Sequence, residues 1–236
     1  MFGLLALFRS TIGQKVLMGV TGLMLVAFIV IHLLGNLLVY SGPEAINAYG
    51  DFLQHGTHGL IWVARLGLLG AVAVHIWTAI ALTRKNRQAR GGRYAGGKKS
   101  NASSYAARTM RYGGVIILLF IIFHLLHLTF GALAPMAGDF KMIAGESGGH
   151  AHADVYGNLV RGFQVPVVSI SYIIAMLAIG WHLYHGIWSG LYTLGLSHPQ
   201  YDAMRKILST SVALIVVIGN CSIPIAVLAG LLGVSQ

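Results

Sequence analysis

Five long apolar runs dominate the sequence and limit the folds that it can adopt. A hydrocarbon layer about 30 Å thick is crossed by about 20 apolar residues in a helix. Runs of that kind cover residues 16–40, 59–82, 112–136, 165–196 and 207–234. They lack the alternation of polar and apolar residues that a membrane β-barrel needs. The sequence therefore predicts an all-α integral membrane protein, with five transmembrane helices forming one domain over residues 1–236.

The composition agrees with a membrane protein. The chain is 56% hydrophobic and 9% charged, whereas a soluble domain has about 25% charged residues. Its net charge of +10 comes from residues between the apolar runs, so it indicates topology and not nucleic-acid binding. The single cysteine, Cys221, excludes an internal disulfide and covalent haem attachment. We expect no cleavable signal peptide, because the first run is too long for one.

The distribution of positive charge predicts the orientation. If the N-terminus is cytoplasmic, 13 of the 16 Lys and Arg residues fall on the cytoplasmic side, and nine of these lie in the linker 84–111. Five of the six acidic residues then fall outside. Because positive charge stays inside, we expect a cytoplasmic N-terminus.

One histidine lies deep in each of the first four runs, at positions His32, His75, His124 and His182. An imidazole in lipid loses its hydrogen bonds to water, so it needs a partner and usually marks a function. The predicted orientation puts His32 and His124 in the outer half of the membrane, and His75 and His182 in the inner half. Two facing imidazoles at one depth can hold one haem. We therefore predict two b haems in a bundle of the first four helices, with the fifth helix packed outside.

Further side chains are candidates for contacts to the haem propionates. His127 and His185 each follow a proposed ligand by three residues, on a similar helix face. Both lie nearer a membrane edge, so we interpret them as propionate contacts or as helix-interface residues. Arg65, at the outer end of the second run, is a third candidate. Its alternative is to extend its charge to the membrane interface.

Several short motifs, spaced over nearly the whole chain, carry a family resemblance. These are IHL at 31–33 with Asn36, GPEAIN at 42–47, VHI at 74–76, RYGG at 111–114, FH at 123–124 and WHLYHGIWS at 181–189. Together they resemble the single-chain, five-helix, di-haem cytochrome b subunit of succinate:quinone oxidoreductases, the family of succinate dehydrogenases and fumarate reductases.

The resemblance implies the same four ligands and the same pairing, with His75 and His182 on the inner side. It implies an anchor in a bacterial inner membrane, with flavoprotein and iron–sulfur subunits on the cytoplasmic face. Succinate chemistry would lie on another subunit. Electrons would pass from the iron–sulfur clusters through two b haems to a quinone, usually menaquinone, near the outer side. Some fumarate-reducing members have a glutamate where this chain has Gly180, which favours succinate oxidation here.

Quinone reduction needs proton donors near the carbonyl oxygens. The first outer loop offers Glu44, Gln54 and His55 as candidates, with a solvated loop as the alternative. His150, His152 and Asp154 are a weak metal-site pattern that we interpret as a polar outer loop. The basic linker 84–111 docks the iron–sulfur subunit or only follows the positive-inside rule.

Other functions remain open at this point. A cytochrome b subunit of a hydrogenase or formate dehydrogenase would share the haems but have a different electron donor. A haem-free membrane anchor would use its histidines only for packing. A transporter is disfavoured, because the runs lack acidic residues and matching helix breaks.

Overall fold

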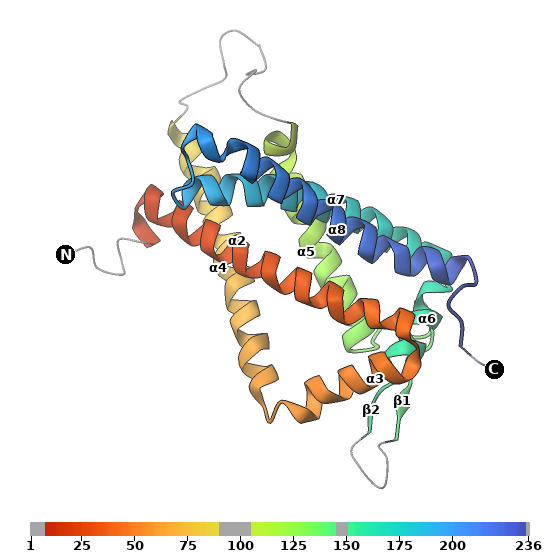
Figure 1. The fold of residues 1–236 in the computed structure, drawn as a ribbon. Coiled ribbons are helices and arrows are strands. Elements are labelled where there is room, and N and C mark those ends of the chain that lie inside the picture. Colours follow the sequence, from red (N-terminus) through yellow and green to blue (C-terminus); the bar gives the residue numbers. More distant parts are fainter. Residues whose placement is uncertain (1–7, 90–104, 145–150, 235–236) are drawn as a thin grey trace.

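A computed structural model describes residues 8–89, 105–144 and 151–234 (Figure 1). Five helices in it are long and apolar enough to cross a membrane. They are α2 (Thr11–Asn36), α4 (Leu60–Ala89), α5 (Tyr105–His124), α7 (Pro166–Thr193) and α8 (Asp202–Leu228). The prediction of an all-α membrane protein with five spans is confirmed.

Shorter elements connect the long helices at one end of the molecule. Between α2 and α4 the chain forms η1 (Leu37–Ser41), α3 (Pro43–Asp51) and η2 (Phe52–Gly56). Between α5 and α7 it forms η3 (Leu125–Thr129), β1 (Met142–Ile143), β2 (His152–Ala153) and α6 (Val155–Phe163). The strands pair antiparallel, with Met142 opposite Ala153. At the other end η5 (Pro199–Tyr201) leads into α8.

The predicted end of the third span was wrong. The apolar run extends to residue 136, but the helical part ends at Thr129. Gly131 follows with a φ of 62°, and Gly138 has a φ of 90°. Glycine adopts this left-handed backbone without a steric penalty, so the chain turns here although its composition stays apolar.

The helices pack as an open row, α4–α2–α7–α5, with α8 along α7 and also touching α2 (Figure 1). Over the described ranges, α2 does not pack closely against α5, and α4 does not pack closely against α7. The two helices that carry each predicted ligand pair, α2 with α5 and α4 with α7, are therefore not in close contact.

The buried side chains form two clusters. One joins α2, α7 and α8 and includes Leu33, Ile179 and Val216. Gly219 allows the close approach of α8 to α2, since a side-chain carbon there would lie 2.8 Å from Leu33. The other cluster joins the α3 and α6 end to α7 and includes Val160.

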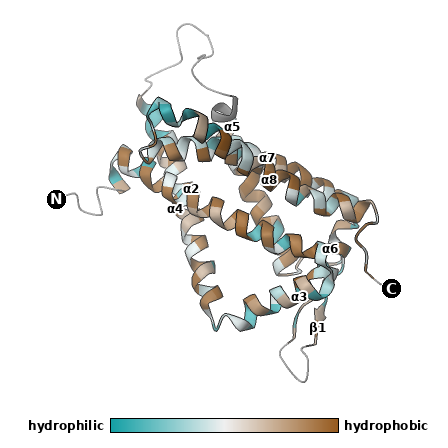
Figure 2. Cartoon of the chain, in the orientation of Figure 1, coloured by the Kyte–Doolittle hydropathy of each residue, from teal (hydrophilic) through white to brown (hydrophobic). Residues whose placement is uncertain are grey.

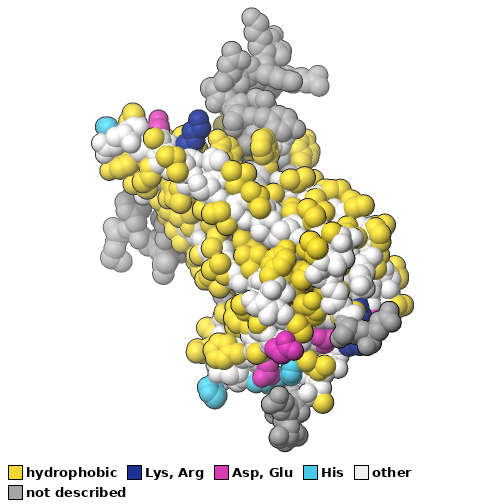
Figure 3. Space-filling view, turned by 45° about the vertical axis from the view of Figure 1, so that its right-hand side comes forward, with side chains coloured by type: hydrophobic (Ala, Val, Ile, Leu, Met, Phe, Trp, Pro, Cys, Tyr) yellow, Lys and Arg dark blue, Asp and Glu magenta, His cyan; other side chains and the backbone are white. Residues whose placement is uncertain are grey.

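The outer surface of the long helices is apolar. Figure 2 shows hydrophobic residues along most of their length. In the face shown in Figure 3, hydrophobic side chains cover the middle, while charged and histidine side chains appear towards the two ends. Because exposed apolar surface of this extent is stable against lipid and not against water, the distribution fits a membrane-embedded body.

Candidate functional site: two facing imidazole pairs

The structure brings the four membrane histidines together in two pairs. The ring centres of His32 and His124 lie 5.8 Å apart, with their planes at 87°. Those of His75 and His182 lie 6.2 Å apart, at 61°. These are the pairs expected from their depths. We name the first the outer pair and the second the inner pair, after the predicted orientation.

The separations fit a bis-histidine haem. A bond from a metal ion to an imidazole nitrogen is about 2 Å long, and that nitrogen lies about 1 Å from the ring centre, so two axial imidazoles have centres about 6 Å apart. Each pair also bridges two helices that do not pack closely, α2 with α5 and α4 with α7. None of the four imidazoles is fully covered by protein atoms. The residues present therefore fit two haems, while their role as iron ligands stays a prediction.

The two pairs are separated along the helices. A side-chain carbon at Gly22 would lie 3.2 Å from Cε1 of His75, so His75 is level with Gly22 on α2. His32 lies ten residues further along α2, which corresponds to about 15 Å of helix. The pairs thus occupy different depths within the row of helices.

In the inner pair, the His75 ring is held by a hydroxyl group. Thr21 Oγ1 lies 3.3 Å from Nδ1 of His75 and donates its own hydrogen to the carbonyl of Leu17, at 2.7 Å. The oxygen can therefore accept from Nδ1–H, which leaves Nε2 with the lone pair that a metal needs. On the facing ring, Nδ1 of His182 is buried with no hydrogen-bond partner among the described residues. Leaving a buried polar atom without a partner costs free energy.

In the outer pair, a tyrosine joins two histidines. The hydroxyl of Tyr172, on α7, lies 3.3 Å from Nδ1 of His124 and 2.9 Å from Nδ1 of His127. Nε2 of His127 lies 2.8 Å from the carbonyl oxygen of Ala137. Both ring nitrogens of His127 are thus bonded within the protein. Of its two expected roles, these bonds favour that of an interface residue, while the propionate contact stays a prediction.

For the other two propionate candidates, His185 and Arg65, the described residues provide no side-chain hydrogen bond. His185 is half-buried on α7, one turn from His182. The guanidinium carbon of Arg65 lies 4.8 Å from the ring centre of Trp62, which is 62% exposed. Such a cation–π contact at an exposed ring is typical of an interface anchor, which is the alternative expected for Arg65.

The quinone-site candidates do not form one cluster. Glu44 lies in the first turn of α3, while Gln54 and His55 lie in η2 after its end. Eleven residues of helix separate Glu44 from His55 by about 16 Å. Asp51 Oδ1 accepts a hydrogen bond from Nδ1 of His55 at 2.7 Å, and both side chains are substantially exposed. The Asp51–His55 pair is thus a hydrogen-bonded pair of titratable side chains in this loop.

Asp154 has a structural role. Its carboxylate accepts from the backbone of Gly157 at the start of α6, from Arg161 at 3.0 Å and from Asn47 on α3 at 3.3 Å. Burial alone would raise its pKa, but these hydrogen bonds outweigh that effect and lower the pKa. His152 lies in β2, so the expected polar loop is partly ordered here, while His150 lies outside the described residues. Throughout the described ranges, no three His, Cys, Asp or Glu side chains are grouped to hold a metal ion.

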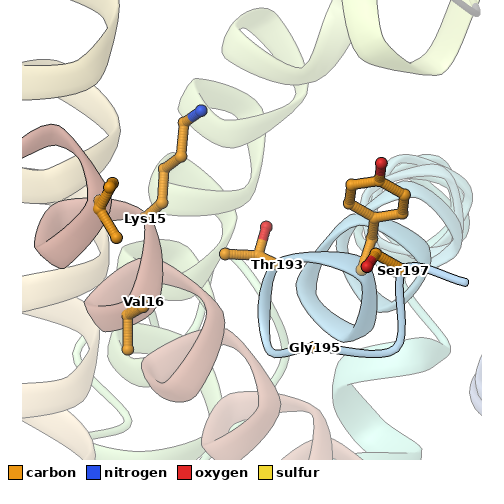
Figure 4. A pocket seen from close by; sticks show the side chains of 7 residues that line it. Lys15, Val16, Thr193, Gly195 and Ser197 are labelled. Atoms are coloured by element: carbon orange, nitrogen blue, oxygen red, sulfur yellow. The ribbon is translucent and has the colours of Figure 1, made fainter.

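Sequence reasoning missed two features at the opposite end. A surface pocket of about 370 Å³ lies between the start of α2 and the end of α7 (Figure 4). It is lined by Ile12, Lys15, Val16, Tyr192, Thr193, Gly195 and Ser197. Nearby Arg205 is only 2% exposed, paired with Asp202 and stacked on Trp188 and Tyr192. Lys15 and Arg205 are two of the 13 positive residues that the sequence places on the cytoplasmic side, and their charge alone indicates only topology.

Comparison of the chain with known protein families, with curated proteins and with solved structures found no match.

Proposed function

We propose that the chain is the membrane-anchor cytochrome b subunit of a succinate dehydrogenase. It would hold two b haems and carry electrons from an iron–sulfur subunit on the cytoplasmic face to a quinone. By the resemblance, this quinone would be menaquinone. The observation that carries this proposal is the presence of two facing imidazole pairs, 5.8 and 6.2 Å apart, at different depths of one helix row.

The chain's own residues would hold and tune the cofactors. His75 and His182 would hold one haem, and His32 and His124 the other. Bound haem would supply one-electron transfer through the apolar layer. The hydroxyls of Thr21 and Tyr172 would fix one ring in each pair by accepting from its Nδ1–H. The apolar helices keep water away from these polar contacts.

The quinone would be reduced on the outer side of the membrane, where the connecting segment carries the hydrogen-bonded Asp51–His55 pair as a candidate proton donor. A quinone takes up two protons with two electrons, so a positioned imidazole at an exposed loop can pass protons from water. This assignment rests on the short hydrogen bond from His55 to Asp51.

The partners are proposed from the charge distribution and the resemblance. The flavoprotein and iron–sulfur subunits would dock on the cytoplasmic face, which carries 13 of the 16 positive residues under the proposed orientation. Succinate oxidation would occur on the flavoprotein. Position 180 supports this direction, because Gly180 stands where some fumarate-reducing members have a glutamate. A side-chain carbon there would contact Val217 of α8 closely.

A dithionite-reduced minus oxidised spectrum, with haem b quantified per chain, tests the proposal. We expect two low-spin haems per chain and co-purification of a flavoprotein and an iron–sulfur protein. If the chain contains haem but co-purifies with hydrogenase or formate dehydrogenase subunits, the electron donor is a different enzyme from the one proposed. A chain without haem would contradict it and leave a simple membrane anchor.

A further inference from the structure

We infer that Tyr172 is a positioning residue of the outer pair, and that with His127 it forms a hydrogen-bonded chain that fixes the tautomer of His124. This series of hydrogen bonds would thereby lower the reduction potential of the haem held by His32 and His124. This inference rests on the proposed function and names residues that the ligand pattern alone does not identify.

The donor and acceptor in each of these hydrogen bonds follow from the last group in the series, the carbonyl of Ala137. The carbonyl oxygen of Ala137 can only accept, so Nε2 of His127 must donate to it. In a neutral ring, Nδ1 of His127 must then accept, and the donor is the hydroxyl of Tyr172 at 2.9 Å. The hydroxyl hydrogen is thereby used, so the Tyr172 oxygen can only accept from Nδ1–H of His124 at 3.3 Å. His124 is left with its lone pair on Nε2, the form that binds a metal.

Packing holds this chain in place. Tyr172 and His127 are 6% and 5% exposed. The ring centres of Phe120 and Phe163 lie 5.0 and 4.8 Å from that of Tyr172. Gly162 leaves room for the imidazole, since a side-chain carbon there would lie 2.5 Å from Nε2 of His127. The chain therefore has little freedom to rearrange or to exchange partners with water.

The wide π-helical turn Leu125–Thr129 contains His127 and follows directly after His124. Turns of this kind occur frequently at functional sites, because they shift the side chains of one turn relative to the next. Here the two histidines on either side of the junction reach the same hydroxyl group.

In the described parts of the sequence, no comparable series of hydrogen bonds reaches the inner pair. The Thr21 hydroxyl at His75 passes its hydrogen to a carbonyl of its own helix, that of Leu17. A ligand that donates its Nδ1–H to a fixed acceptor gives more electron density to the metal, which favours oxidised iron. Because Tyr172 bonds His124 of the outer pair, we expect its loss to affect the outer haem, and the two haems to respond differently.

The test is a redox titration of both haems in the intact membrane complex, comparing wild type with Tyr172→Phe. The outer component is assigned as the one absent in His124→Ala. We expect Tyr172→Phe to keep two haems and to raise the reduced-to-oxidised ratio of the outer one up to about tenfold at fixed potential, equivalent to about 59 mV for one electron. Tyr156→Phe is the matched control, since it removes a hydroxyl bonded to the carbonyl of Gly233 and should change neither haem.

The outcomes separate the inference from the proposed function. Two haems with unchanged potentials in Tyr172→Phe, or a shift of the inner component alone, overturn the inference and leave the proposed function standing. Absence of haem from the wild-type chain overturns the proposed function itself. If Tyr172→Phe loses the outer haem, the same titration is made on His127→Phe. An upward shift in the potential of the outer haem supports the inference, and an unchanged potential refutes it.

Discussion

The imidazoles of His75 and His182 face each other with ring centres 6.2 Å apart, although α4 and α7, which carry them, are not packed closely together. Side chains of that size usually meet across packed helices. Here the two rings meet across a separation that suits a flat group with an atom to bind at its centre.

Replacement of His182 tests the inner ligand against its neighbour. We expect His182→Ala to lose about half of the haem, because one haem held by only one imidazole is released more readily, and His185→Ala to keep both haems. Haem b per chain and the reduced spectrum measure the effect. Equal losses in the two variants would show that the ligand is wrongly assigned.

Enlarging Gly22 tests the space around His75. A side-chain carbon there would lie 3.2 Å from Cε1 of His75, so Gly22→Val should displace the ring and reduce the inner haem component by half or more. Gly67→Val on α4 is the matched control, since a side-chain carbon at Gly67 would meet nothing within 4 Å. Full haem content in Gly22→Val would mean that the ring position is not critical.

Substitution of His55 tests the proposed proton donor. We expect His55→Gln to slow quinone reduction by about 10²-fold, the typical cost of losing a positioned acid or base, with haem content unchanged. Succinate:quinone activity is compared with succinate oxidation by an artificial acceptor that bypasses the membrane subunit. Normal quinone kinetics would place the site elsewhere.

The carboxylate of Asp154 predicts a pH dependence of stability. Its folded-state pKa lies below the ordinary value of 3.8, so its stabilising effect is complete above the unfolded pKa and is lost as the pH falls through the folded one. Asp154→Asn should therefore lower the Tm in detergent at neutral pH. Because asparagine still caps α6, the loss comes from the ion pair with Arg161 and should be at most about 1 kcal/mol in the free energy of unfolding. The difference from wild type should shrink below about pH 4.

Asp139→Asn serves as the control for that measurement, because only the backbone carbonyl of Asp139 takes part in a described hydrogen bond, with Arg161. A gap between wild type and Asp154→Asn that stays constant from neutral to acid pH would argue against the carboxylate as its cause.

The sequence was sufficient for the spans and for the pairing of the histidines, because both depend on distance along a helix. Apolar runs fix which segments cross the membrane, and the direction of each run converts position into depth. His32 and His124 could thus be matched although 92 positions separate them in the sequence.

Other features depend on contacts that no local pattern encodes. The role of His127 follows from Tyr172, 45 residues away, and from the carbonyl of Ala137 in a turn formed by glycines. The burial of Arg205 depends on two aromatic rings of α7. Its charge suggested only a cytoplasmic surface residue, because an arginine is seldom this buried.

The attachment of α4 has a consequence for how such a protein is assembled. In the described parts of the chain this helix packs extensively only against α2, so it is attached to the rest of the helix row along one side. Neither core cluster includes a residue of α4, so both clusters can form without it. If the proposed haem is bound, His75 and His182 would join α4 to α7, and the cofactor would supply a link that helix packing alone does not.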